Sequence, residues 1–331
     1  MRKRGIGFSC SFQASTIGFG HPDTSDTLLE ITDANEFVIH SAASDLGQGL
    51  EATLIKIVSD AFGGLSGKKI RWQGAETGEP DSGTTGASRQ TTITGNALLE
   101  ACLTLKAGLA GVAAEMLDFP PDQLDFQGKT VKGGGRRIPL IDVLDQARRE
   151  NLTLQASGRF SAPPTTPVDE RGKGEPINQI SYATHVAEVE VDTETGEVFV
   201  LKITAYHDSG RVLHQIGAEG QVEGGIAMGL GFALMEEFLQ DRGQPVNIGF
   251  TNYPIPTSFD APEIEVHFIN TEIALGKLGV KGLAEIPTAT IAPAITNAIF
   301  DAVGARVTRI PATPERVYSA IQQGVQGNED Q

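Results

Sequence analysis

The sequence predicts an α+β protein made of two layer sandwiches, each a sheet covered by helices on one face. Three observations predict this class. Strand-like and helix-like segments alternate irregularly along the 331 residues. That length suits two domains of roughly 150 residues each. A stretch rich in Pro and Gly, residues 162–176, separates two halves with a similar order of elements. We therefore expect one domain over residues 1–160 and a second over residues 161–331.

The first half combines short strands with amphipathic helices. Alternating apolar side chains predict strands over residues 5–12, 27–32, 36–41 and 69–72. Apolar side chains at helical spacing predict helices over residues 49–62, 94–117 and 140–150. A polar loop, residues 76–90, precedes the second helix, and loops of this length in a compact domain tend to be functional.

The second half repeats this order of elements. We expect strands over residues 185–192, 198–207 and 263–269, and helices over residues 222–239 and 287–303. A last helix has a clear start signal, because Thr313 is a good N-cap and Pro314 suits the first turn.

Composition excludes several classes of protein. The chain has 26 basic and 42 acidic residues and a formal charge of −16, whereas nucleic acid and anionic membranes need clustered Lys and Arg. Two cysteines, Cys10 and Cys102, are too few for an iron–sulfur or structural zinc site and fit a reducing cytoplasm. The basic start lacks the apolar core of a signal peptide, and no run reaches the roughly 18 apolar residues of a membrane span. We expect a cytoplasmic protein with no nucleic-acid or membrane partner.

Three short motifs lie where a strand or loop gives way to a helical pattern. They are S-D-L-G-Q-G from Ser44, G-A-E-G-Q-V-E-G-G from Gly217 and G-V-K-G-L-A-E-I-P from Gly279. Glycine lets backbone N–H groups approach a ligand closely, a helix start offers unpaired donors, and glutamine adds a neutral amide. The motifs together favour a site for a large, anionic, hydrogen-bonding cofactor. A flexible helix start is the alternative for each Gly-Gln pair.

Glu285 is the candidate catalytic carboxylate. Its uncharged neighbours predict desolvation that raises its pKa, while the helix start after it favours the anion and lowers its pKa. A carboxylate in that balance can act as a general base. The alternative is an ordinary first-turn glutamate that satisfies helix amides.

Other polar and glycine-rich segments carry weaker signals. The loop S-G-T-T-G-A-S-R-Q, residues 82–90, offers hydroxyls, amides and one arginine for phosphate or polar-ring contacts. Several glycines in the helix after Gly220 imply close contact with another helix or with a ligand. His207, Asp208 and His214 have no metal-ligand spacing, and we expect no protein ligands to a metal.

The motifs occur in an order that resembles the molybdopterin-binding subunit of the xanthine dehydrogenase/aldehyde oxidase family of molybdenum hydroxylases. The ordered set is R-G-I-G, G-Q-G, G-A-S-R-Q, G-Q-V-E-G, N-Y-P-I-P-T, P-E-I-E-V, G-V-K-G-L-A-E and A-T-P-E-R-V. The similarity covers almost the whole chain and corresponds to the C-terminal half of the longer family subunits. It implies that both layer sandwiches are of the cofactor-binding type of this family.

The resemblance implies a role for each matched position. Glu285 would be the base that deprotonates the attacking oxygen, which is derived from water. The cofactor-binding residues would be Gly47, Gln48, Gly49, Ala87, Ser88, Arg89, Gln90, Gly220, Gln221, Lys281 and Gly282. The loop that includes Gln13, Ile17 and Phe19 would face the substrate pocket. The molybdenum would be held through the pterin dithiolene and by no protein side chain.

The short length implies a divided enzyme. The chain resembles the medium subunit of the nicotinate dehydrogenase arrangement, in which large and medium molybdopterin subunits are separate chains. The cofactor would be molybdenum–molybdopterin cytosine dinucleotide. A large molybdopterin subunit would complete the site, and iron–sulfur and FAD subunits would carry 2Fe–2S clusters and FAD. The substrate would be an aromatic N-heterocycle, nicotinate-like or a purine.

Two other functions remain open from the sequence. One is aldehyde or carbon monoxide oxidation by an enzyme of the same family. The other is a non-catalytic subunit that binds a nucleotide and assembles a complex, which would use the same glycine-rich helix starts.

Overall fold

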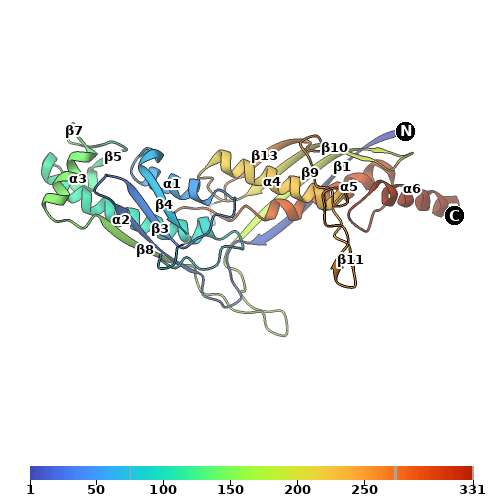
Figure 1. Ribbon diagram of the computed structural model, residues 1–331, viewed down its shortest axis with the longest axis horizontal. Coiled ribbons are helices and arrows are strands. Elements are labelled where there is room, and N and C mark those ends of the chain that lie inside the picture. The colour runs from blue at the N-terminus through green and yellow to red at the C-terminus, as the bar shows by residue number, and fades with distance from the viewer. Residues whose placement is uncertain (75, 272–273, 330–331) are drawn as a thin grey trace.

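The computed structural model describes residues 1–74, 76–271 and 274–329. The molecule is elongated, and both ends of the chain lie at the same end of the long axis (Figure 1). Two four-stranded sheets follow one another along that axis, each packed against helices. The predicted α+β class is confirmed.

The first sheet has the order β4-β3-β2-β8. Its strands are β2 (Thr24–Ile31), β3 (Phe37–Ser41), β4 (Ile70–Gly74) and β8 (Gln155–Ser161). The pair β3–β4 is parallel and the other two pairs are antiparallel. Helix α2 (Gln90–Leu117) packs on β2 and β8, and α1 (Leu50–Ala61) packs on α2 and β4. The apolar faces of these elements form one buried core.

A small subdomain covers the end of the first sheet's core. Its sheet joins β5 (Asp125–Gln127), β6 (Thr130–Gly133) and β7 (Arg136–Pro139), and helix α3 (Leu140–Arg149) follows. Short 3-10 turns lie at Gly67–Lys69 and Pro121–Gln123. The sequence analysis did not predict β5, β6, β7 or β8, because these strands carry too few apolar side chains to show alternation.

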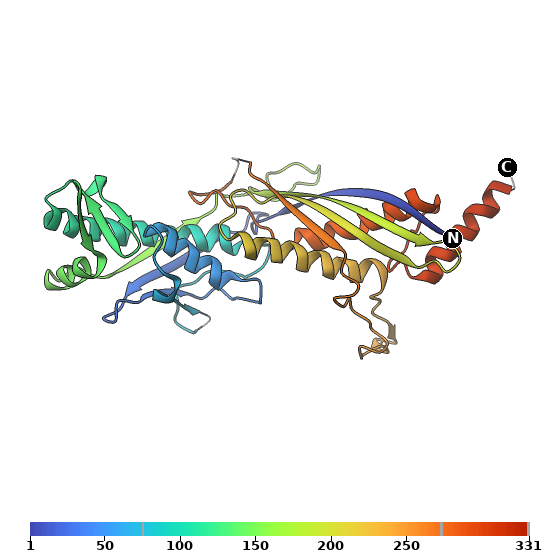
Figure 2. The same ribbon diagram turned by 90° about the horizontal axis from the view of Figure 1, so that it is seen from above.

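The second sheet has the order β1-β9-β10-β13. Its strands are β1 (Arg2–Ala14), β9 (Ile180–Asp192), β10 (Val198–Asp208) and β13 (Glu263–Ile269). Helices α4 (Gln215–Leu234) and α5 (Ile286–Val303) lie along one face of this sheet (Figure 2). A hairpin of β11 (Gln240–Asp241) and β12 (Gln244–Pro245) projects from the body, and α6 (Pro314–Glu329) ends the described chain.

The first strand pairs within the second sheet, whereas the sequence predicted one domain over residues 1–160. Strand β1 pairs antiparallel with β9 along its whole length, from Arg2 to Ala14. Gly5 and Gly7 let β1 pack closely on α5, because a Cβ at either position would overlap the backbone of α5 at Ala298. We therefore propose that the first domain begins after β1, and that residues 161–331 share the second domain with β1.

Helix α4 starts earlier than predicted. It begins at Gln215 and ends at Leu234, whereas the sequence predicted residues 222–239. The reason is an unusual N-cap, since the Nδ1 of His214 accepts a hydrogen bond of 2.9 Å from the backbone of Gly217. The pair Gly220-Gln221 therefore lies inside the helix and not at its N-terminus. Helix α2 likewise begins at Gln90, four residues before the predicted start.

Two helices have the length and apolar composition of a membrane span. They are α2 and α5, with mean hydropathies of 1.5 and 1.2 over 18 residues, and half of each window is buried. Each lies at the centre of one of the two cores. Core packing therefore accounts for their composition.

Two histidines are buried side by side in the second core. Nε2 of His185 lies 2.9 Å from Nε2 of His207, and among the described residues neither Nδ1 has a hydrogen-bond partner. Burial lowers the pKa of His185 to about 3, with a further contribution from His207, and burial lowers the pKa of His207 to about 4. Both rings are therefore neutral in the folded protein at pH 7.

This pair predicts a loss of stability in mild acid. Histidine in the unfolded chain has a pKa of about 6.5. Below that pH the unfolded chain therefore binds protons at these two positions, whereas the folded chain does not. The contribution of the pair to stability has its full value above pH ~6.5. Below that pH the free energy of unfolding falls by about 1.4 kcal/mol per pH unit for each histidine, until the pH reaches the folded pKa. Chemical denaturation between pH 5 and 7 measures this slope.

Replacing one member of the pair tests its contribution. The variant His207→Asn should reduce the slope by about 1.4 kcal/mol per pH unit. Equal slopes for His207→Asn and the parent chain would contradict this account.

Candidate functional site

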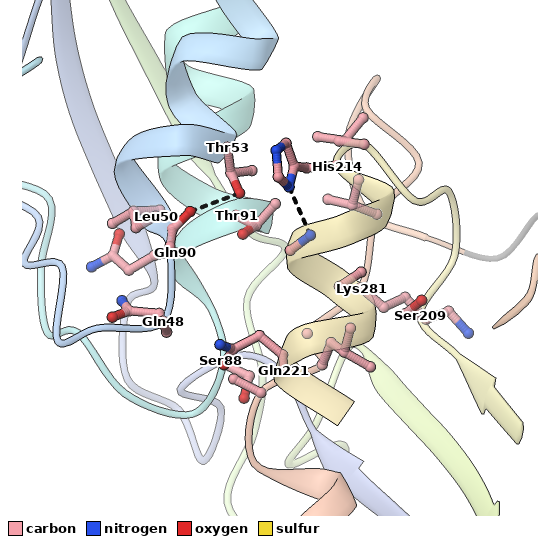
Figure 3. Close-up of a pocket in the computed structure, with 18 of the residues that line it drawn as sticks. Gln48, Leu50, Thr53, Ser88, Gln90, Thr91, Ser209, His214, Gln221 and Lys281 are labelled. Carbon is pink, nitrogen blue, oxygen red and sulfur yellow. Dashed lines mark hydrogen bonds between the residues drawn. The ribbon is translucent and has the colours of Figure 1, made fainter. Parts of the chain in front are cut away.

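A cavity of about 220 Å³ lies where the two layers meet. Its walls come from the start of α1, the loop before α2, the first turns of α4 and the segment before α5 (Figure 3). The predicted site residues that line it are Gln48, Gly49, Ser88, Arg89, Gln90, Gln221, Lys281, Gly282 and Glu285. The structure thus brings the three sequence motifs into one place, although the first and the third are separated by more than 200 residues.

Glu285 is held by two side chains from other segments. Its Oε2 accepts a hydrogen bond of 2.6 Å from Nε2 of Gln13 and one of 2.8 Å from Oγ of Ser88. The Ser88 hydroxyl also accepts a bond from the Glu285 backbone N–H at 3.3 Å. Glu285 is the N-cap residue of α5, where the helix dipole favours a negative charge. Its side chain is exposed, so the predicted burial is not supplied by this chain.

The turn that carries Ser88 is strained. Ala87 and Ser88 both have positive φ, 51° and 49°, which residues with a Cβ rarely adopt. Gly282 packs directly beneath, because a Cβ there would lie 2.6 Å from the Cβ atoms of Ser15 and Ser88. Glycine at 282 is therefore required for the loop before α2 to reach Glu285.

Arg89 and Gln90 shape the loop from inside the protein. Arg89 is only 1% exposed, and its Nε donates to Asp23 Oδ1 at 2.6 Å. Its other nitrogens donate to the carbonyl oxygens of Ser82, Thr84 and Thr24. Gln90 bonds to Thr84, Thr85 and Thr94. Arg89 and Gln90 thus donate their hydrogen bonds to the loop itself. Any role of these two side chains in holding the cofactor is therefore limited to shaping the surface of the loop.

The start of α1 carries its own anion, which the sequence analysis missed. The carboxylate of Asp45 accepts hydrogen bonds from the backbone N–H groups of Gly47, Gly49 and Glu51. Burial raises the pKa of Asp45, but these backbone bonds outweigh burial and lower its pKa below the ordinary value. Asp45 lies five residues before Leu50, the first residue of α1, and the N-cap residue itself is Gly49, so the usual N-cap signal does not point to Asp45.

The capping carboxylate changes what the Gly-Gln turn can offer. The backbone N–H groups of Gly47 and Gly49 already donate to Asp45, and contact of these two glycines with the cofactor stays a prediction. Gln48 braces the same turn, as its Nε2 donates to the Ser44 carbonyl at 3.1 Å and its Oε1 accepts from Leu46. No atom lies within 4 Å of where a Cβ of Gly47 or Gly49 would be, so both glycines keep an open face.

Lys281 is also engaged within the chain. Its ammonium is buried and bonds to Asp208 Oδ2 at 2.7 Å and to Thr271 Oγ1 at 2.9 Å. A buried pair of this kind is costly to break, because either partner alone is an uncompensated charge. The neighbouring Ser209 lines the cavity, and its buried hydroxyl has no partner in the described part of the chain.

Helix α4 presents its glycines in two directions. A Cβ at Gly225 would lie 2.7 Å from Pro287 Cβ, and one at Gly229 would overlap Ile291, so these glycines let α4 pack closely on α5. Gly220 and Gly224 face open space instead. Gln221 lies on the α4 side of the cavity and Gln48 on the α1 side (Figure 3).

Three of the predicted cofactor-binding residues lie outside the cavity wall. Gly47, Ala87 and Gly220 are each adjacent in sequence to a residue that lines the cavity. Of the predicted substrate-pocket residues, Gln13 contacts Glu285, whereas Ile17 and Phe19 are held by Asp23 and Pro176 and do not line the cavity.

The comparisons with known proteins show the family of the chain. The molybdopterin cofactor-binding domain family matches residues 1–262. The chain belongs to this family. In the described residues no group of three or more His, Cys, Asp or Glu could hold a metal ion.

Relatives of this molybdopterin-binding chain are longer proteins. An aldehyde oxidoreductase of Megalodesulfovibrio gigas is 29% identical over 326 residues, 96% of this chain and 32% of the relative. A putative xanthine dehydrogenase molybdenum-binding subunit of Escherichia coli is 30% identical over 96% of this chain and 42% of the relative. A solved aldehyde oxidoreductase from Desulfovibrio gigas superposes with a TM-score of 0.82 at 28% identity, over 97% of this chain and 33% of that one. The chain therefore spans between about a third and two fifths of the length of these relatives.

The open and closed glycines of this molybdopterin-binding chain make a testable pair. Gly282→Ala would force a Cβ against Ser15 and Ser88, and overpacking of this kind costs about 1–3 kcal/mol. Gly224→Ala adds a Cβ in open space on a helix and should be neutral or stabilising by up to ~1 kcal/mol. Thermal or denaturant unfolding of both variants measures the difference, and equal stabilities would contradict the packing described at Gly282.

Proposed function

We propose that this chain forms one wall of the molybdopterin site of a molybdenum hydroxylase that acts on an aromatic N-heterocycle. Oxygen from water would enter the substrate, and the electrons would leave through iron–sulfur and FAD partner subunits. The observation that supports this most is the convergence of Gln48, Gln221 and Glu285 on one cavity from three distant motifs.

The cavity chemistry fits a large hydrogen-bonding heterocycle. Gln48 and Gln221 supply neutral amides, and the buried hydroxyl of Ser209 has no hydrogen-bond partner within the residues that the structure describes. The open faces at Gly47 and Gly49 leave room for a flat group against the turn. We propose that these residues contact the pterin, which when bound carries the molybdenum that accepts two electrons from the substrate.

Arg211 is the cation best placed for the anionic part of the cofactor. The lining also holds Arg89 and Lys281, but both are buried in ion pairs. Arg211 is exposed and lines the cavity, and within the described residues its side chain makes no ion pair. Its backbone N–H is fixed by the Gly279 carbonyl at 2.7 Å. The sequence analysis passed over Arg211, since nothing in S-G-R-V marks a ligand. We propose that it faces the diphosphate of a cytosine dinucleotide form.

Glu285 would act as the general base. Gln13 and Ser88 both donate to Oε2, so the carboxylate is fixed in one orientation. Within the described residues Oε1 accepts no hydrogen bond, which leaves it able to take a proton. Because the side chain is exposed in this chain alone, exclusion of water there requires a further polypeptide.

The partners proposed are a large molybdopterin subunit and subunits that carry 2Fe–2S clusters and FAD. A relative of Paenarthrobacter nicotinovorans, 29% identical over 97% of this chain, is named as subunit gamma of the 6-hydroxypseudooxynicotine dehydrogenase complex.

Burial raises the pKa of Cys102 to about 12, so this thiol is inert. We propose a cytoplasmic complex with no nucleic-acid or membrane partner.

Aldehyde oxidation is the second candidate function. It is favoured by the aldehyde oxidoreductase of Megalodesulfovibrio gigas, which matches this chain over 96% of its length. The same Glu285 and cavity would serve, because both reactions need a base beside the bound cofactor. Turnover of nicotinate, xanthine and benzaldehyde by the purified complex separates the two.

Substitution of the base tests the proposal directly. Glu285→Gln preserves the size of the side chain and an oxygen that can accept from Gln13 and Ser88, but it removes the carboxylate that would accept the proton. Turnover by the complex should fall by about 10²–10⁴-fold, the usual worth of general base catalysis, while molybdenum content stays unchanged. Glu223→Gln, an exposed glutamate of α4 outside the cavity wall, is the control and should keep full activity.

Two results would count against the proposal. Near parental turnover of Glu285→Gln would remove the role given to this carboxylate. A complex without molybdenum and without cytosine nucleotide after acid extraction would favour a non-catalytic assembly subunit instead.

A further inference from the structure

We propose that the uncovered face of the second sheet is the docking surface for the polypeptide that supplies the rest of the molybdenum subunit. This inference rests on the proposed function, which requires such a polypeptide. The surface, called the outer face below, lies on the side of the sheet away from α4 and α5. Its residues are Phe8, Cys10, Phe12, Tyr182, Thr184, Val186, Thr204 and Tyr206.

The direction of these side chains follows from strand alternation. Ser9 and Ser11 of β1 point to α5, where both contact Thr290. Phe8 and Phe12 therefore point to the opposite side, where they are 65% and 70% exposed. In β1 the odd-numbered residues therefore face the core and the even-numbered residues face the outer face.

The strand register gathers these side chains into one patch. Phe8 lies opposite Val186, which lies opposite Thr204 on the next strand. The next rows pair Cys10 with Thr184 and Tyr206, and Phe12 with Tyr182. Exposed aromatic side chains thus continue across three adjacent strands. A contiguous apolar patch of this kind marks an interaction site in soluble proteins.

The patch ends where charges begin. Toward the N-terminus of β1, Arg2 and Arg4 both bond to Glu190 across the same face, and on β10 Lys202 pairs with Glu263 and Glu265. Those ion pairs suit a surface that stays in water. The apolar half lies at the other end of β1, next to Gln13 and the site. A partner seated on it would lie beside the cavity.

The occupant is argued from the length of the relatives. They align with nearly all of this chain, but the aligned part is 32% of one relative and 42% of another, so more than half of each lies outside it. A second copy of this chain is less suited, because each copy carries a formal charge of −16 and association would bring two such charges together.

The chain carries its own probe of the outer face. Cys10 is exposed in the middle of the patch, and Cys102 is buried. The complex is purified from its native source through a tag on this chain and treated with a small maleimide beside the isolated chain. Mass spectrometry should find Cys10 fully labelled in the isolated chain and at least tenfold slower to label in the complex. Equal labelling rates would overturn the proposal.

Substitutions on the outer face give the second arm of the test. Phe8→Asp and Phe12→Asp should each lower recovery of the companion polypeptide at least tenfold. Ile141→Asp, at a half-exposed apolar residue of α3, is the matched control and should not. Because Phe8 and Phe12 are mostly exposed, the isolated variants should melt like the parent chain, and Phe8→Ser is the milder substitution if they do not.

Two further outcomes separate the alternatives. A homodimer of the isolated chain that Phe8→Asp dissociates would assign the face to a second copy and overturn the proposal. Molybdenum is measured in the same samples. A complex that protects Cys10 but holds no molybdenum would support the docking surface and contradict the proposed function.

Discussion

The site depends on one close crossing of backbone at Gly282. The end of β1, the loop before α2 and the segment before α5 meet there, and a Cβ on residue 282 would collide with Ser15 and Ser88. Two of these segments belong to the second layer and one to the first. The absence of a single methyl group therefore sets how the two layers join, and it places Ser88 within 2.8 Å of Glu285.

Several charges near the cavity serve the architecture before they serve a ligand. The buried pair Arg89–Asp23 ties the loop before α2 to the start of β2, and Lys281–Asp208 ties the segment before α5 to the end of β10. The carboxylate of Asp45 accepts a hydrogen bond from the backbone N–H of Glu51 at the positive end of the α1 dipole. What remains for a ligand is a set of neutral amides and hydroxyls and one exposed arginine. That balance suits a polar heterocycle with a diphosphate better than a bare phosphate group.

The exposed features share one explanation. Glu285 is solvent-accessible, and the aromatic half of the second sheet faces water although its other face packs tightly on α5. Both are unfavourable for a chain that works alone, since a base needs exclusion of water and an apolar sheet face needs cover. We propose that both are covered by the polypeptide that corresponds to the rest of the longer relatives.

The sequence by itself determined the class of fold, the family and most helices, because those depend on local periodicity and on motif order. Strand β13 and the starts of α1 and α5 were predicted to within a residue of their positions. Residues of all three motifs line one cavity, and the site they were predicted to form stays a prediction. Only the tertiary structure decided where each side chain spends its hydrogen bonds. From the sequence, Arg89 and Lys281 resemble cations that bind a ligand. In the structure both are buried and paired with carboxylates, while Arg211 stays accessible. Strand β1 joins a partner about 180 residues away, and pairing between distant strands leaves no local pattern in sequence.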